Sequence, residues 1–202
     1  TSTQYEGIHL ATSVGAEISG NKIVAETGAE YGVFIENCVN LVTGPTHIFN
    51  NFIVCAGQFF LAGIEVDKSA YVNVYHNTVN IYSPTQGSYC LEIAGTGSSN
   101  VEILNNIFTN NGIGYAFNVS PSPIGAVCAF DYNDLYTSVG GMIGIYDNDT
   151  IVDVLDLQTT HSIGLNSVTA DPQYISSTDL HVGSAGVNDL GIPLVAVTED
   201  FD

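Results

Sequence analysis

The stretch Ile48-Phe49-Asn50-Asn51-Phe52-Ile53 decides the fold, because a unit of the same form recurs along the chain. Each unit holds an asparagine with one apolar residue three positions before it and another two positions after it. The other copies are Ile18-Ser19-Gly20-Asn21-Lys22-Ile23, Val74-Tyr75-His76-Asn77-Thr78-Val79, Ile103-Leu104-Asn105-Asn106-Ile107-Phe108 and Phe130-Asp131-Tyr132-Asn133-Asp134-Leu135. The central asparagines are Asn21, Asn51, Asn77, Asn106 and Asn133, at intervals of 30, 26, 29 and 27 residues. This cadence predicts strands that turn a corner at asparagine and then resume.

A second unit with the same cadence precedes each of these corners. Its apolar pairs are Ile8/Leu10, Val33/Ile35, Ile64/Val66, Leu91/Ile93 and Phe117/Val119. Alternation with a period of two means that one face of each short strand is buried. Since one coil cannot bury that face alone, equal repeats stack coil on coil. The sequence therefore predicts an all-β fold, a right-handed parallel β-helix, with coils over about residues 5–140 and an irregular C-terminal cap over about 141–202.

The repeated asparagines are interpreted as a structural ladder. Asparagine tolerates left-handed backbone angles, and its amide can hydrogen-bond locally or to the asparagine of the next coil. In the cap, Asp153 is placed to begin a short helix that carries Val154, Leu155 and Leu157 and ends before Gly164. No linker divides residues 1–202, so we expect a single domain, which we interpret as a segment of a larger protein.

The charge balance excludes several classes of function. The chain has 21 acidic residues against two lysines, Lys22 and Lys68, and it has no arginine. Nucleic-acid binding and polybasic attachment to a membrane surface both require many cations. The chain is 45% hydrophobic, which favours a folded domain over disorder. No apolar run approaches the roughly 18 residues that span a bilayer, so no membrane insertion is expected.

The four cysteines form no CxxC pair, which argues against zinc and thioredoxin-like chemistry. Their even number permits two disulfides without requiring them. Cys128 falls at a position predicted to point inward, where a free cysteine behaves as a small hydrophobe.

The repeats over residues 5–140 resemble those of secreted bacterial proteins with right-handed parallel β-helix repeats, in the pectate-lyase-like superfamily. The later segment is similar to the tail of many such surface proteins, although it lacks the proline of their "S-P-A-I-D-A-G" turn. The matching runs are Asn166-Ser167-Val168-Thr169-Ala170-Asp171-Pro172-Gln173-Tyr174, Asp179-Leu180-His181-Val182 and Ser184 to Gly191. The resemblance implies a location outside the cell or at its surface.

The same resemblance raises the question of polysaccharide cleavage. Lyases of the superfamily use a lysine or arginine as base, and neither lysine here has a basic neighbour in the sequence. Its polygalacturonase-type hydrolases carry Asp-Asp and Gly-His-Gly strings, which this chain lacks. Glu65 and Glu92 occupy matching outward positions one coil apart, and three interpretations stay open: a catalytic pair, a cation site or a solvated face. No catalytic residue is assigned.

An outward row predicts a binding surface. Phe49, Tyr75 and Leu104 lie two positions before their corner asparagines in three consecutive coils, and beside them run His47, Asn73 and Glu102. Such a mixture of apolar and hydrogen-bonding groups suits a sugar. The alternative is that the cap or a long loop covers the row.

Closely spaced acids in the cap predict a calcium site. Asp147, Asp149 and Asp153 provide oxygen ligands of the kind that calcium prefers, without the glycine and terminal glutamate of an EF-hand loop. The histidines show no zinc-binding spacing. The sequence therefore predicts either no cofactor or Ca²⁺.

Two classes of function remain. The first is a non-catalytic extracellular structural or adhesive module that self-assembles or binds carbohydrate. Its expected partners are carbohydrate or neighbouring subunits or domains of the same protein, in a homo-oligomer or filament. The second is a polysaccharide-active enzyme, a glycoside hydrolase or lyase.

Overall fold

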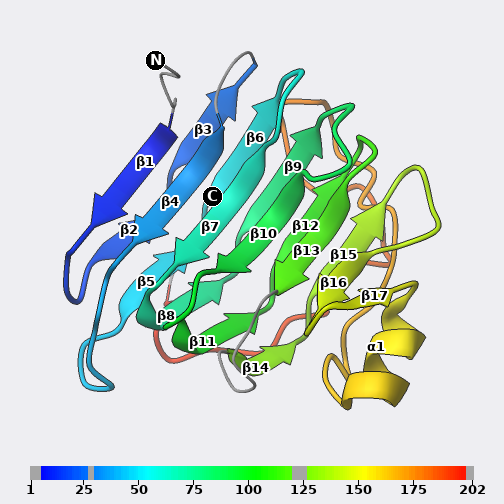
Figure 1. Cartoon of the computed structure of the whole chain (residues 1–202). Coiled ribbons are helices and arrows are strands. Elements are labelled where there is room, and N and C mark those ends of the chain that lie inside the picture. The colour runs from blue at the N-terminus through cyan, green and yellow to red at the C-terminus, as the bar shows by residue number, and fades with distance from the viewer. Residues whose placement is uncertain (1–5, 27–29, 120–126, 199–202) are drawn as a thin grey trace.

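The computed structural model describes residues 6–26, 30–119 and 127–198 and shows a parallel β-helix of five coils (Figure 1). Each coil contributes one strand to each of three sheets, and strands from successive coils are parallel neighbours within a sheet; only β17, at the end of the first sheet, pairs antiparallel among the described strands. The β-helix predicted from the sequence is confirmed.

The first sheet has seven strands and the other two have five each. The first sheet is β1 (Glu6–Ala11), β4 (Tyr31–Glu36), β7 (Ala62–Asp67), β10 (Tyr89–Ala94), β13 (Tyr115–Val119), β16 (Gly144–Tyr146) and β17 (Asp149–Ile151). The second sheet is β2 (Glu17–Ser19), β5 (Thr46–Phe49), β8 (Ala70–Tyr75), β11 (Ser99–Leu104) and β14 (Val127–Asp131). The third sheet is β3 (Lys22–Ala25), β6 (Phe52–Ala56), β9 (Thr78–Tyr82), β12 (Ile107–Asn110) and β15 (Asp134–Thr137).

The register of the first sheet stacks equivalent apolar residues into one inward column. The column consists of Ile8, Val33, Ile64, Leu91 and Phe117, paired from strand to strand in that order. All but the first are completely buried. The column ends at Gly144, where a Cβ atom would lie 2.3 Å from the Phe117 ring. β16 therefore needs a glycine at this position to pack over that ring.

The repeated asparagines are joined from coil to coil. The side-chain amide of each donates to the Oδ1 atom of the next, with N···O distances of 2.9 to 3.1 Å, and its backbone N–H donates to the same atom. The order is Asn21, Asn51, Asn77, Asn106 and Asn133. At the last coil the Asn133 N–H donates to Ser167 Oγ, 3.1 Å away, so a serine of the C-terminal segment ends this asparagine ladder.

The left-handed backbone lies one residue before each ladder asparagine, which corrects the reason given above for asparagine at the corner. The residues with positive φ are Gly20, Asn50, His76, Asn105 and Tyr132. Because the preceding residue makes the turn, the ladder asparagine is selected for its amide, which satisfies buried backbone groups of two coils.

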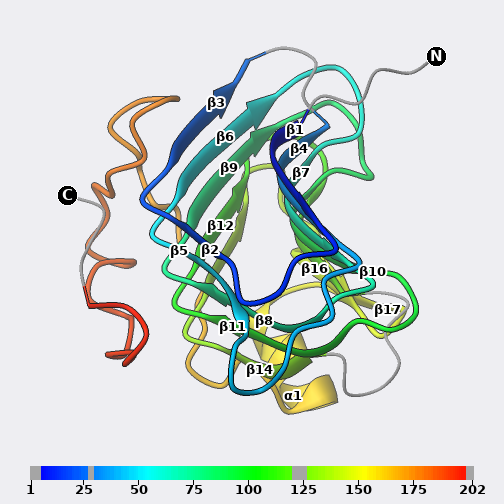
Figure 2. The same ribbon diagram turned by 90° about the vertical axis from the view of Figure 1, so that its left-hand side faces the viewer.

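The last coil is covered and then followed by a long extended segment. β17 pairs antiparallel with β16, and α1 (Val154–His161) begins at its N-cap Asp153, which accepts from the Asp156 N–H at 2.8 Å. The helix predicted there is confirmed. The C-terminal segment, residues 162–198, contains no helix or strand and runs along the outer side of the third sheet (Figure 2).

Cys128 is exposed, so the prediction that it points inward is wrong. Val127 pairs with Val101 but Ala129 pairs with Glu102, and Cys128 is the extra residue of a β-bulge. A bulge places one residue outside the alternation of the strand. The other cysteines, Cys38, Cys55 and Cys90, are buried free thiols. No helix in the described part of the chain has the length and apolarity needed to cross a membrane.

Candidate functional site

The second sheet brings the predicted binding row together on its outer face. His47, Asn73 and Glu102 pair in register on adjacent strands. Phe49, Tyr75 and Leu104 form the next row in the same way. Hydrogen bonds cross between the strands, because Asn73 Nδ2 lies 3.4 Å from His47 Nδ1 and the Tyr75 hydroxyl donates to Glu102.

The central ring of this row is not open to a ligand. Tyr75 is 5% exposed, and burial followed by its bond to Glu102 raises the pKa of its hydroxyl far above the usual value. Phe49 and Leu104 are half-buried on either side. The C-terminal segment reaches the neighbouring corner, where Asn105 bonds to the backbone of Ile192. A sugar would therefore meet the edges of this row rather than a flat aromatic face.

The first sheet brings Glu65 and Glu92 side by side. Their Cα atoms are register partners on β7 and β10, and Asn118 follows on β13. Asn118 Nδ2 donates to Glu92 Oε1 at 2.9 Å. Glu65 is only 8% exposed, so it does not belong to a solvated face.

The electrostatics of this pair favour the neutral acids. Burial, followed by the charges of Glu92 and Asp67, raises the pKa of Glu65 to about 8. Burial also raises the pKa of Glu92 to about 7, against the lowering effect of its bond from Asn118. Lys68 is nearby but forms a 2.8 Å ion pair with Asp67. Glu65 therefore keeps its proton at neutral pH, and Glu92 is partly protonated there.

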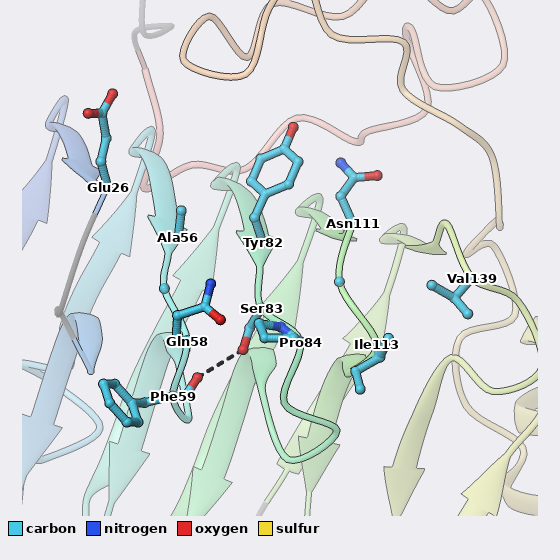
Figure 3. Close-up of a pocket in the computed structure, with 12 residues that line it drawn as sticks. Glu26, Ala56, Gln58, Phe59, Tyr82, Ser83, Pro84, Asn111, Ile113 and Val139 are labelled. Carbon is cyan, nitrogen blue, oxygen red and sulfur yellow. Dashed lines mark hydrogen bonds between the residues drawn. The ribbon is translucent and has the colours of Figure 1, made fainter.

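A groove that the sequence did not predict crosses the coils where the third sheet turns back toward the first. It encloses about 760 Å³, and Figure 3 shows side chains from successive coils along it. Its lining is Glu26 from the first coil, Ala56 to Phe59 from the second, Tyr82 to Pro84 from the third, Asn111 to Ile113 from the fourth and Val139 from the fifth. Four strand spacings of about 4.8 Å make this groove about 19 Å long.

The groove combines exposed apolar groups with amides. Phe59 is 72% exposed, Val139 is 65% exposed and Ile113 is 48% exposed. Asn111 Nδ2 donates to Asn80 Oδ1 at 3.0 Å, and Asn80 Nδ2 donates to the Tyr82 hydroxyl at 3.1 Å. This network orients the polar groups beside the apolar surface.

The backbone of the groove is held by bonds between coils. Ser83 Oγ donates to the Phe59 carbonyl at 2.8 Å, the bond drawn in Figure 3, and the Ile113 N–H donates to the Ser83 carbonyl at 3.0 Å. The loops are therefore fixed by neighbouring coils, which keeps the groove formed without a ligand.

Sequence reasoning missed the groove because its residues lie in connections of unequal length, outside both repeated units. The available signal was apolar residues such as Phe59 and Ile113 in these connections, where the inward periodicity does not require them.

The three predicted calcium ligands have different positions and contacts in the structure. Asp147 lies in the turn between β16 and β17 with a positive φ of 51°, Asp149 lies 3.5 Å from His161, and Asp153 is the N-cap of α1. Within residues 6–26, 30–119 and 127–198, no group of three or more His, Cys, Asp or Glu side chains is placed to hold a metal ion. Calcium at this position stays a prediction.

Comparisons with protein-family models, with curated proteins and with solved structures found no match to this chain.

Proposed function

We propose that this chain is a non-catalytic structural module of an extracellular or cell-surface protein, and that its groove between the third and first sheets binds an uncharged carbohydrate chain. The proposal includes kinship with the secreted β-helix proteins of the pectate-lyase-like superfamily, which rests on the sequence motifs.

The observation that carries the proposal is the 72% exposed Phe59 in a groove that also contains Tyr82 and Asn111. A large apolar ring left in water beside oriented polar groups is typical of a ligand site. The apolar face of a sugar ring can pack on such a side chain while amides bond to its hydroxyls. Since all five coils contribute residues along the groove, a polymer of sugars fits better than a compact ligand.

The charge of the chain favours an uncharged polymer over an acidic one. A formal charge of −19 repels acidic polysaccharides at long range, and only a basic cleft would reverse that field. Lys68 is paired with Asp67, which raises the pKa of the ammonium and so keeps it protonated, leaving no neutral amine to act as a base. Lys22 lies on β3, outside the groove lining.

The test is calorimetric titration with cellohexaose, xylohexaose and a mannan hexasaccharide, with hexagalacturonate as the acidic comparison. We expect at least one uncharged oligomer to bind and Phe59→Ala to weaken it about tenfold or more, equivalent to about 1.4 kcal/mol. Leu41→Ala is the matched control, because Leu41 is 65% exposed and outside the groove lining.

Two outcomes would contradict this assignment. Binding that survives Phe59→Ala but fails in Phe49→Ala would move the site to the row on the second sheet. Tight binding of hexagalacturonate alone would contradict the charge argument.

The carboxylate pair supports a second candidate, a glycoside hydrolase. Retaining hydrolases place two carboxyl groups about 5 to 5.5 Å apart, a separation within reach of register partners on adjacent strands. Glu65, with its pKa raised to about 8, would serve as the general acid. Release of reducing ends that disappears in both Glu65→Gln and Glu92→Gln would favour this function; no release from any of the oligomers supports the non-catalytic module.

A further inference from the structure

A second hollow adjoins the groove where the later coils turn back into the first sheet. It encloses about 350 Å³ and shares Ile113 and Val139 with the groove. Figure 3 shows both side chains at the same end of the groove. Because both are exposed, a chain that lies in the groove can pass over them into the second hollow. The lining of the second hollow is Gln86 from the connection after β9, Ile113 to Tyr115 from that after β12, and Thr137, Val139, Gly140 and Met142 from that after β15.

Tyr115 provides a fixed aromatic surface in this hollow. It is the first residue of β13, and its backbone N–H donates to the Ser88 carbonyl at 2.9 Å. Its ring stacks on Tyr89, with 5.8 Å between the ring centroids and 17° between the ring planes. Tyr115 is half-buried and lines the hollow, whereas Tyr89 does not line it. The ring is therefore supported on the side of Tyr89, and a ligand in the hollow would meet the rest of its surface.

Tyr115 and Gln86 leave hydrogen-bonding capacity for a ligand. Gln86 Nε2 donates to the Tyr115 hydroxyl over a long distance, 3.4 Å. The hydroxyl proton has no acceptor among the described residues, and the Gln86 Oε1 atom has no donor there. Gln86 is exposed, so water or a ligand reaches its amide. A ligand with adjacent hydroxyl groups can accept from Tyr115 and donate to Gln86.

The rest of the wall is neutral and in part backbone. The described lining of the second hollow contains no acidic or basic side chain. Gly140 has a φ of 73°, and a Cβ atom built there would meet no other atom within 4 Å. The hollow is therefore open at this glycine. An aromatic ring beside a few hydrogen-bonding groups, with no charge, suits a neutral ligand that has an apolar face and a hydroxylated edge.

We propose that the second hollow is the end subsite of the groove and holds one pyranose ring of an uncharged carbohydrate chain. The apolar face of the sugar packs on the Tyr115 ring, and two adjacent hydroxyls bond to the Tyr115 hydroxyl and to Gln86 Oε1. This inference rests on the proposed function, because the other sugars of the chain lie along the groove beside Phe59. It extends the carbohydrate site from the groove onto the first sheet.

The experiment is calorimetric titration of the full chain with cellohexaose, xylohexaose and the mannan hexasaccharide. We expect Tyr115→Ala to weaken the hexasaccharide that binds by about tenfold, because the end sugar loses its aromatic surface. Tyr115→Phe and Gln86→Ala should each weaken it about threefold, since each removes one hydrogen bond. The matched control is Tyr136→Ala, because Tyr136 is also half-buried but lines neither the groove nor the second hollow; its affinity should change less than twofold.

A direct readout separates contact with the sugar from an effect on the fold. In a chain with ¹³C-labelled tyrosine rings, the NMR signal that is missing from Tyr115→Phe belongs to Tyr115. This signal should shift when the hexasaccharide is added, with the midpoint that calorimetry gives. The melting temperature of Tyr115→Phe should stay close to that of the parent chain, because the ring and its stacking on Tyr89 are kept.

Two results would overturn the end subsite: an unchanged affinity in Tyr115→Ala, or a Tyr115 signal that does not move when the chain is saturated with sugar. If Phe59→Ala weakens binding and Tyr115→Ala does not, the groove stands and only the end subsite is removed. The reverse pattern would support the second hollow as a sugar site and contradict the groove. Failure of all three oligomers to bind would contradict both.

Discussion

The two ends of the β-helix bury their apolar residues to very different extents. At the first coil, Ile8 and Leu10 on β1 and Ile23 on β3 are only partly buried. At the last coil, the equivalent residues Val119 on β13 and Leu135 on β15 are completely buried. Both ends carry the inward pattern of the middle coils, so the pattern alone does not bury a residue; a neighbour on each side does.

The asparagine ladder shows the same contrast. Asn21 is half-buried, and the ladder continues from it in one direction only, to Asn51. At the other end Asn133 is almost fully buried, and Ser167 of the C-terminal segment takes the place of a further asparagine. The C-terminal end is therefore closed by residues that do not repeat. Among the described residues, β1 has a strand neighbour on one side only. Such an edge can pair with another strand, and light scattering over a concentration series would show whether the chain associates there.

Truncation of a core side chain should give the largest difference in stability between the middle coils and the first coil. Ile64 and Ile8 belong to the same inward column, but only Ile64 is completely buried. We expect Ile64→Ala to lower the free energy of unfolding by about 2 to 5 kcal/mol, because it leaves a cavity that neighbouring coils cannot fill. Ile8→Ala should cost about 1 kcal/mol, since less apolar area is involved.

Urea denaturation followed by circular dichroism measures both variants, with the slope checked to be unchanged. Equal losses at the two positions would break the comparison, because they would mean that the first coil is as well covered in solution as the third.

Removal of ladder amides should give the next largest difference. Asn77→Ala deletes an amide that bonds to Asn106, to the Ile48 carbonyl and to the Tyr75 carbonyl, all in buried surroundings. The groups left without partners should cost about 1 to 3 kcal/mol in total. Asn21→Ala, at the half-buried end, should cost less than 1 kcal/mol because water can replace the lost bonds. Hydrogen exchange of the Asn51 N–H, which donates to Asn77 Oδ1, provides a local readout, and its protection should drop in Asn77→Ala alone.

The smallest expected effect is on the pH dependence of the free energy of unfolding. The pKa of Glu65 is raised to about 8 in the folded chain from an ordinary value of 4.5, so between these pH values the folded state binds more protons than the unfolded state. Stability contributed by the neutral acid is present below about pH 4.5 and is lost as the pH rises through about 8. Glu65→Gln should therefore raise the free energy of unfolding at pH 8 by on the order of 1 kcal/mol, with little change at pH 4.5.

Glu17→Gln is the control from the open end, because Glu17 is exposed on β2. Glu17→Gln should leave the change in the free energy of unfolding between pH 4.5 and pH 8 the same as in the parent chain. A parent chain whose stability rises between these pH values would contradict the raised pKa of Glu65.

The sequence by itself determined the repeating coil and the inward column of apolar residues. The period of the asparagine units and the alternation of pairs such as Ile64/Val66 are enough to predict both. Stacked coils place residues at the same position of each repeat next to one another. The short helix after Asp153 followed from capping chemistry, which is also local.

The tertiary structure alone decided how exposed each outward residue is. Cys128 turned outward at a bulge that depends on pairing with β11, and Tyr75 became buried through contacts between strands. The groove at Phe59 and the hollow at Tyr115 arise where segments of unequal length meet. Periodicity describes the phase of a residue within its own coil, whereas burial, pKa and the shape of a site depend on neighbours that are distant in sequence and do not repeat.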